Sequence, residues 1–235
     1  MPLSRIAAFL FPITCAACGA DLPHDDQFRL CPRCRSALRM LDGLVCVTCG
    51  VPLDSGGAHC YACRSGACYR FACLRSAVRY EGVARKLIHA FKYGNRDYLT
   101  RALGSVLTDC VRRHETILAA DIIVPVPMHW TKKWLRGYNQ AELLARHAAA
   151  ELHMPVHTGV LRRRRRGKVQ AALDRESRKQ NVRNLIAVRD GRPVRGKRIL
   201  LIDDVATTGA TLDACAAALR TAGALAVACA TVARD

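Results

Sequence analysis

Eight cysteines in the first quarter of the chain have the spacing of metal ligands. They form four C-x-x-C pairs, namely Cys15 and Cys18, Cys31 and Cys34, Cys46 and Cys49, and Cys60 and Cys63. Two residues between a pair of thiolates let both sulfurs bind one tetrahedral ion, and four thiolates close a zinc site against water. The four pairs therefore predict two structural zinc ions.

An internal repeat indicates how the pairs combine. Sequential, interleaved and nested arrangements would each give two sites, but residues 15–22 and 46–53 share the pattern C-x-x-C-G-x-x-L, and a second pair follows each copy. The shared glycine allows the positive φ that often closes such a turn. We therefore expect one ion at Cys15, Cys18, Cys31 and Cys34, and the other at Cys46, Cys49, Cys60 and Cys63.

Redox chemistry is the main alternative for these cysteines. A single C-x-x-C pair in a thioredoxin-like β-α context can act as a dithiol switch, but no such context surrounds the four pairs here. Cys68 and Cys73 lie outside the pattern, and we expect Cys110, Cys215 and Cys229 to be small core residues.

The second group of residues that could do chemistry lies at residues 199–212, ILLIDDVATTGATL. An apolar strand places Asp203 and Asp204 at its end, and a Thr/Gly-rich turn then opens into a helix. The turn's amides and hydroxyls, with the helix N-terminus behind them, can bind a phosphate monoester. The two carboxylates can accept hydrogen bonds from sugar hydroxyls or organise a magnesium ion through water. Together these features predict a ribose 5-phosphate ligand.

A plainer interpretation is an acidic strand end followed by a Thr-rich helix cap that binds nothing. A D-D or T-T-G sequence alone would deserve that interpretation, whereas the whole string at a strand-to-helix junction is more specific. The string lacks G-K-[ST], which disfavours a nucleoside triphosphate P-loop.

Alternating strands and helices should position this loop. Hydrophobic patterns predict strands at residues 76–80, 121–126, 198–202 and 225–232, and helices at residues 82–93, 98–118, 140–152 and 210–222. Such alternation indicates an α/β fold with a mostly parallel sheet, in which ligands bind beyond the carboxyl ends of the strands. We expect a cysteine module at residues 1–66 and the α/β domain at residues 67–235.

The N-terminus bears on the compartment. Residues 3–10 form a short apolar run that could be a weak secretory signal, which would make the cysteines a disulfide framework. Pro12 interrupts the run and no suitable cleavage site follows, so we expect an amphipathic helix and a reduced, cytoplasmic protein. No apolar stretch is long enough to span a bilayer, so no membrane insertion is expected.

Several motifs, together with the loop, resemble the ComF family of bacterial competence-related proteins. These are Phe11-Pro12, Arg75-Ser-Ala, residues 87–93, residues 124–127, residues 136–140, the Arg-rich stretch that ends at Gln170, Asn181-Val182, and residues 203–211. The last of these resembles the phosphoribosyl pyrophosphate (PRPP) signature of type I phosphoribosyltransferases. The resemblance implies a cysteine-rich zinc module followed by a type I phosphoribosyltransferase-like domain.

The resemblance also implies roles for individual residues. Asp203 and Asp204 would contact the ribose hydroxyls, and the 5-phosphate would lie in the loop formed by Val205, Ala206, Thr207, Thr208, Gly209, Ala210 and Thr211. Residues 126–136 would correspond to the pyrophosphate loop and residues 163–170 to a mobile hood. Candidate pyrophosphate ligands, acting with magnesium, are Lys132, Lys133, Arg136, Arg163 and Arg165.

The charge distribution adds a second class of partner. The net charge is +18, and residues 162–198 hold fifteen Lys or Arg against three acids, a net +12. Like-charge blocks often bind nucleic acid through its phosphates, which predicts nonspecific contact with DNA, single-stranded DNA in particular. No aromatic residues interleave with the charges, so base-specific recognition of a single strand is not expected. The family resemblance implies a role in DNA uptake or use, with a helicase-like partner.

Three hypotheses follow. The chain is a PRPP-dependent transferase whose acceptor the sequence does not show, or a non-enzymatic DNA-binding adaptor of the uptake machinery that retains the loop for sensing or structure, or a zinc-only interaction module. The third leaves the loop at residues 203–211 unexplained.

Overall fold

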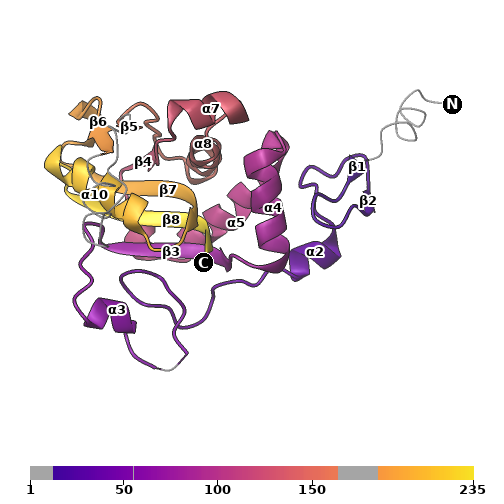
Figure 1. The fold of residues 1–235 in the computed structure, drawn as a ribbon, viewed down its shortest axis with the longest axis horizontal. Coiled ribbons are helices and arrows are strands. Elements are labelled where there is room, and N and C mark those ends of the chain that lie inside the picture. Colours follow the sequence, from indigo (N-terminus) through magenta and orange to yellow (C-terminus); the bar gives the residue numbers. More distant parts are fainter. Residues whose placement is uncertain (1–12, 55, 164–184) are drawn as a thin grey trace, which may run out of the picture.

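A four-stranded sheet, parallel throughout, forms the centre of the molecule (Figure 1). The computed structural model describes residues 13–54, 56–163 and 185–235. In spatial order, the strands are β3 (Cys73–Arg79), β8 (Ala226–Arg234), β7 (Arg198–Ala206) and β4 (Ile122–Pro125). The two central strands are almost entirely buried, as expected for a parallel sheet that is covered on both faces.

Helices cover both faces of this sheet. One face packs against α5 (Thr100–Arg112) and α8 (Gln140–Leu152), with α4 (Gly82–Tyr93) beside them, and the other face packs against α10 (Ala210–Thr221). In α4 the predicted apolar stripe is inward, since Leu87, Ile88 and Phe91 are buried. The α/β class and the mostly parallel sheet that the sequence predicts are therefore confirmed.

Most predicted elements are present, but several differ in extent; β8, for example, continues two residues beyond the predicted end at residue 232. The helix expected at residues 98–118 is a short 3-10 turn, η1 (Asp97–Leu99), then α5, and then a separate α6 (Glu115–Leu118), because the chain leaves the helical path at His114. Strand β3 begins three residues earlier than predicted. Strand β7 continues four residues beyond Ile202, because Asp203 and Val205 pair with Thr231 and Ala233 of β8.

Four elements in the described part of the α/β domain were not predicted. These are α7 (Trp130–Arg136), the antiparallel strands β5 (Leu161–Arg163) and β6 (Ile186–Val188), and the 3-10 turn η2 (Arg192–Val194). Helix α7 has no buried residue, so no apolar periodicity marks it in the sequence. The predicted N-terminal helix at residues 3–10 and the basic stretch at residues 164–184 lie outside the described residues.

The cysteine module forms two small lobes at different places on the α/β domain (Figure 1). The first lobe holds β1 (Ile13–Thr14), β2 (Asp21–Leu22) and α2 (Pro32–Ser36), and the second holds α3 (Tyr61–Arg64). The division at residues 66 and 67 stays a prediction. Among the described residues, no helix has both the length and the apolar character needed to cross a membrane.

Candidate functional site: two cysteine clusters and a ligand loop

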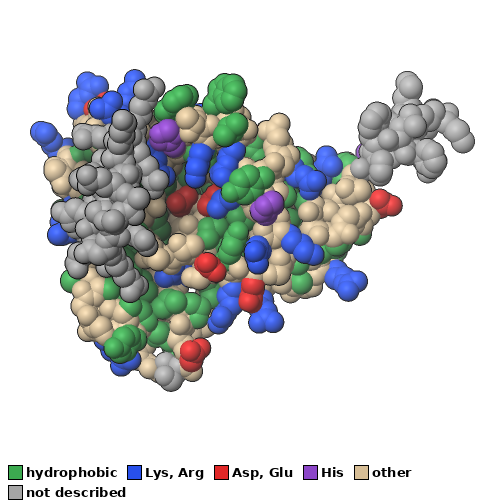
Figure 2. Space-filling view, viewed as in Figure 1, with side chains coloured by type: hydrophobic (Ala, Val, Ile, Leu, Met, Phe, Trp, Pro, Cys, Tyr) green, Lys and Arg blue, Asp and Glu red, His purple; other side chains and the backbone are tan. Residues whose placement is uncertain are grey.

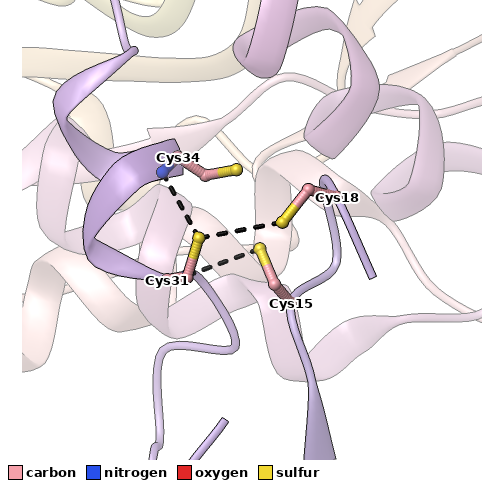
Figure 3. Close-up of side chains that lie close together, drawn as sticks. All are labelled: Cys15, Cys18, Cys31 and Cys34. Carbon is pink, nitrogen blue, oxygen red and sulfur yellow. Dashed lines mark hydrogen bonds between the residues drawn. The ribbon is translucent and has the colours of Figure 1, made fainter. Parts of the chain in front are cut away.

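The first cysteine cluster gathers the four residues that the repeat predicts (Figure 3). Cys15, Cys18, Cys31 and Cys34 place their sulfurs within 4.8 Å of one another. The Sγ atoms of Cys18 and Cys31 are 3.8 Å apart, and the amides of Cys31 and Cys34 donate to the sulfurs of Cys15 and Cys31, each at 3.4 Å. Amides directed at sulfur favour the thiolate, which is the form that binds metal.

The second cluster repeats this arrangement with Cys46, Cys49, Cys60 and Cys63, whose sulfurs also lie within 4.8 Å of one another. The sequential pairing is thus the one that the structure has. The shared glycine acts as expected, because Gly19 and Gly50 have φ of 77° and 68°. At Gly50 there is a second constraint, since a Cβ there would lie 2.3 Å from the carbonyl oxygen of Leu74.

The two clusters show the same pattern of raised and lowered thiol pKa values. Burial alone would raise the pKa of Cys15 and of Cys46, but the backbone amides around each sulfur lower it, to about 6 for Cys15 and about 5 for Cys46. Burial and the neighbouring thiols raise the pKa of Cys34 and of Cys63. Each cluster thus has a sulfur that is readily ionised beside one that holds its proton, and Zn²⁺ replaces such protons when four thiols converge. The residues present fit two closed zinc sites, each with four cysteine ligands.

The remaining cysteines follow the predictions. Cys110, Cys215 and Cys229 are buried in the core, where burial raises the pKa of each thiol. Cys73 is buried in β3, and Cys68 is exposed.

The ligand loop joins β7 to α10 at the carboxyl edge of the sheet. Val205 and Ala206 still belong to β7, Thr207 and Thr208 are exposed, Gly209 precedes the helix, and Ala210 and Thr211 lie in its first turn. The Thr208 hydroxyl accepts a hydrogen bond from the Ala210 amide at 3.3 Å, across Gly209, which is the N-cap residue of α10. The loop therefore presents two hydroxyls and a helix N-terminus to solvent.

The two carboxylates lie on opposite faces of β7. Asp204 is buried and forms an ion pair with Lys92 of α4, with 2.8 Å between Nζ and Oδ1. Asp203 faces α10, where its charge contributes to the raised pKa of Cys215. This divergence follows from the extension of β7, because successive side chains of a strand alternate between faces. Acidic and basic side chains meet below α7 in the middle of the face that Figure 2 shows.

Asp203 is the more strongly perturbed acid. Desolvation and the neighbouring charge of Asp204 raise its pKa to about 7, against the opposing effects of the Asp204 amide, Lys92 and Arg163. A cation or a hydroxyl donor beside Asp203 would favour its ionised form. Mg²⁺ usually binds through one or two carboxylates, with water and ligand oxygens completing its shell, so a single carboxylate at this edge of the sheet is a donor that fits it.

Lys92 is a site residue that was not predicted from the sequence, although it lies in the motif at residues 87–93. The hydroxyl of Tyr138 and the amide nitrogen of Gln140 both donate to the carbonyl of Phe91, at 2.7 and 3.1 Å. That carbonyl lies in the last turn of α4, where no intrahelical donor remains. The motif at residues 136–140 thus fixes the end of the helix that carries Lys92.

The described candidates for pyrophosphate ligands lie in two places, on α7 and at the end of β5. Lys133 pairs with Glu142 at 3.5 Å, and Arg136 stacks on the ring of Tyr93 at 4.6 Å. Lys132 is exposed on the same helix. More than half of residues 126–136, the region predicted to be the pyrophosphate loop, is therefore helix α7. Arg163 ends β5 near enough to Asp203 to lower its pKa. Arg165 and the rest of the predicted hood lie outside the described residues.

Tyr69 is a second contact that the sequence did not indicate. It lies between the second cluster and β3, and its hydroxyl donates to the carbonyl of Thr208 at 3.3 Å while its ring stacks on Phe71 at 4.6 Å. The amide of Arg70 donates to the Asp213 carboxylate in the first turn of α10, at 2.6 Å. Residues 69–71 therefore support the ligand loop from the side of the second cluster.

Comparison with known proteins matches both parts of this arrangement. A family model described as a double zinc ribbon domain matches residues 6–64, which contain both cysteine clusters, and one described as a phosphoribosyl transferase domain matches residues 139–235, which contain the ligand loop. These matches confirm the predicted fold class and the zinc-binding character of the two clusters.

Two curated proteins are similar over most of the chain. Competence protein F from Haemophilus influenzae is 29% identical over 222 residues, which cover 91% of this chain and 93% of that protein. The DNA utilization protein YhgH from Escherichia coli is 32% identical over 205 residues, covering 84% of this chain and 87% of that protein. Among solved structures, the glutamine PRPP amidotransferase from B. subtilis matches at a TM-score of 0.40 and 22% identity, over 60% of this chain and 30% of that one.

Proposed function

The chain belongs to the family of competence protein F and the DNA utilization protein YhgH, and from this premise we propose that it binds PRPP or a related ribose 5-phosphate with magnesium. The observation that carries the proposal is the joint position of the Thr207–Thr208 hydroxyls, the α10 N-terminus and the acidic pair at one edge of the sheet. A phosphate monoester and a sugar diol are the ligand groups that these parts fit. We further propose that the protein serves DNA uptake or the use of DNA-derived nucleotides.

The chemistry proposed for this site is phosphoribosyl transfer. The bond between ribose C1 and pyrophosphate breaks, and a bond forms from C1 to an acceptor nucleophile that is not yet identified. Positive charge develops on the sugar and negative charge on the leaving pyrophosphate, so electrostatic positioning carries the rate. Asp203 and Asp204 hold the ribose hydroxyls while the charge of the ring rises, and the ion pair with Lys92 holds the Asp204 carboxylate in place.

The leaving group requires cations. When bound, magnesium supplies part of that charge. The proposed protein ligands are Arg163, which lies near Asp203, and Lys132, Lys133, Arg136 and Arg165. Lys133 and Arg136 would first have to leave their contacts with Glu142 and Tyr93.

Calorimetry with PRPP and magnesium tests the binding proposal. We expect wild-type protein to bind, and Asp204→Asn to bind at least tenfold more weakly, because the ribose contact and the partner of Lys92 are both lost. A matched control is Glu151→Gln, which breaks an exposed ion pair with Arg112 far from the loop and should leave affinity unchanged. No binding by wild-type protein at millimolar PRPP would contradict the proposal. Pyrophosphate release that depends on an added base or amine would establish turnover.

A second candidate function, nonspecific contact with single-stranded DNA, is favoured by one described feature. A groove of about 770 Å³ runs between the first cluster and α4, and its lining includes Arg85, Lys86 and Arg96, with His89 and Tyr93 on the same helix. No acidic residue is among the described residues that line it. Figure 2 shows basic side chains along this side of the molecule. Cations that bind phosphates and exposed rings that stack on bases are the usual means of holding a single strand. In this role the protein would act as an adaptor beside a helicase-like partner.

Gel shifts with a single-stranded oligonucleotide test the DNA proposal. The double variant Arg85→Glu with Lys86→Glu should weaken binding and reduce the salt dependence by about one unit of slope per lost phosphate contact. Arg146→Glu with Lys197→Glu makes the same charge change at exposed residues outside the groove and is the control. Equal losses in both double variants would assign the binding to net charge rather than to the groove.

A further inference from the structure

The last residue of the central strand β8 is an arginine in an unusual environment. Arg234 is 8% exposed, and its Nε and Nη1 atoms are the buried side-chain nitrogens that find no hydrogen-bond partner within the described part of the chain. Its backbone is well fixed, because its carbonyl accepts from the Tyr80 amide at 2.8 Å and the next amide donates to Ala206. Two nitrogens of a buried guanidinium are therefore left without a partner among the residues that the structure describes.

Such an arrangement is costly unless something compensates it. Removing a guanidinium from water without hydrogen bonds costs several kcal/mol, and buried cations in folded proteins are almost always paired. The groups around Arg234 indicate where a hydrogen-bond partner for its side chain would lie. Burial and the thiols of the second cluster raise the pKa of Tyr69, and the charge of Arg234 acts in the opposite direction, so the guanidinium lies within electrostatic range of this side chain.

The position of Arg234 relative to the ligand loop indicates that partner. In the parallel register, Arg234 is aligned with Ala206, the last residue of β7, and the loop begins at Thr207. Tyr69, which the Arg234 charge influences, donates to the carbonyl of Thr208. The guanidinium thus lies beside the loop, on the side where residues 69–71 pack, and α10 directs its N-terminus into the same region.

We propose that Arg234 is an anion-binding residue that holds the phosphate monoester of the loop ligand. This inference rests on the proposed function, and adds to it a ligand contact from a strand outside the β7–α10 segment. A guanidinium can bind two phosphate oxygens at once through parallel N–H···O hydrogen bonds, and such bonds are stronger than those of neutral donors. The phosphate would compensate the buried charge, and the loop amides would bind its remaining oxygens.

The test is calorimetry on the zinc-loaded full chain with ribose 5-phosphate, ribose and inorganic phosphate as separate probes. We expect Arg234→Met to lose at least 30-fold in affinity for ribose 5-phosphate and to lose detectable binding of inorganic phosphate. Arg234→Lys keeps the charge but not the paired geometry, and should lose about tenfold or less. Arg79→Met is the matched control, because Arg79 is aligned with Arg234 on the neighbouring strand but is exposed, and its affinity should stay within twofold of wild type.

Thermal unfolding provides a second readout that a structural role would not give. Arg234→Met should unfold at a higher temperature than wild type without phosphate, because a buried guanidinium with unpartnered nitrogens is gone, and added phosphate should stabilise wild type but not the variant. Arg234→Met should also keep both zinc ions. If Arg234 instead pairs with the zinc–thiolate group of the second cluster, the variant will lose zinc, and that loss overturns the proposal.

The outcomes separate this inference from the proposed function. Binding of ribose 5-phosphate by wild type and by Arg234→Met with equal affinity overturns the role of Arg234 alone. Failure of wild type to bind either PRPP or ribose 5-phosphate overturns the proposed function and, with it, the role of Arg234.

Discussion

The two cysteine clusters share one repeat but have different surroundings. In the first lobe, Leu30 and all the cluster cysteines except Cys18 pack into the core that also contains α4 and α5. Arg35 and Arg101 both stack on Phe28. In the second lobe, the turn that carries Cys46 and Cys49 packs on the start of β3, where the Leu74 amide donates to the carbonyl of Thr48 at 2.8 Å. From there, residues 69–71 continue to the ligand loop.

This difference separates two roles that a repeated motif can have. The C-x-x-C-G-x-x-L pattern fixes the sulfur geometry in both places, since it depends only on local backbone conformation. What each cluster supports depends on residues outside the pattern. We infer that the first cluster stabilises a helical face, whereas the second also stabilises the ligand loop, and the following predictions test this division in order of expected effect.

The largest effect should come from removing one zinc ligand. Cys18 and Cys49 are equivalent positions of the repeat, so Cys18→Ser and Cys49→Ser should each lower the zinc content from two ions to one. Because residues 69–71, which follow the second lobe, contact the loop and the first turn of α10, Cys49→Ser should lower the affinity for ribose 5-phosphate more than tenfold, and Cys18→Ser less than threefold. Zinc content by elemental analysis and affinity by calorimetry check this prediction. Equal losses of affinity would remove the distinction between the clusters.

The next effect concerns the carboxyl edge of the sheet, where the ligand loop lies, and should leave both zinc sites intact. Asp204→Asn leaves the half-buried ammonium of Lys92 without its partner, which should cost about 2 kcal/mol of unfolding free energy, while the zinc content stays at two. Glu151→Gln breaks an exposed pair and should cost less than about 1 kcal/mol. Urea denaturation measures both. A loss of zinc in Asp204→Asn would show that the edge and the clusters unfold together.

A pH-dependent effect follows from Asp203. Its pKa of about 7 in the folded protein lies above the ordinary 3.8, so the folded state binds the proton more tightly, and stability falls as the pH rises from about 4 through 7. Asp203→Asn should remove this decline and stabilise the protein at pH 8 on the order of 2 kcal/mol, since one pKa unit corresponds to about 1.4 kcal/mol and partial solvent contact reduces the effect.

Asp121 is the control with the opposite sign. Hydrogen bonds from the Arg198 side chain and amide lower the pKa of Asp121, so its contribution is present above about pH 4 and is lost as the pH falls further. Asp121→Asn should therefore weaken the protein at pH 8. Denaturant midpoints at pH 5 and pH 8 compare the two variants, and a stability gain in both would contradict the assignment to Asp203.

The sequence predicted the features that depend on local spacing. The two clusters, the bounds of α4 and α8, and the strand–loop–helix at residues 203–211 all follow from patterns within about 20 residues. Contacts across the sequence were not predictable in the same way. Lys92 reaches Asp204 over more than 100 residues, and Tyr69 reaches Thr208 over 139. The extension of β7 depends on pairing with β8, which a polar Asp-Asp sequence does not suggest.

The smallest effect tests the single hydrogen bond through which the Tyr69 side chain reaches the loop. Tyr69→Phe keeps the stacking on Phe71 and removes only the bond to the Thr208 carbonyl, which at 3.3 Å is long for a hydroxyl donor. A neutral hydrogen bond contributes about 0.5–1.5 kcal/mol, so we expect roughly a threefold loss of affinity for ribose 5-phosphate and unchanged zinc content.

Tyr61→Phe is the matched control for this bond, because Tyr61 is in the second lobe and is 79% exposed. It should bind ribose 5-phosphate like wild type. If Tyr69→Phe also binds like wild type while Cys49→Ser does not, then the second cluster supports the loop through the packing of residues 69–71 and the Arg70–Asp213 contact rather than through the hydroxyl. The difference between the two clusters would then come from how the second lobe packs, because the hydrogen bonds from the Leu74 and Arg70 amides remain in both Tyr69→Phe and Tyr61→Phe.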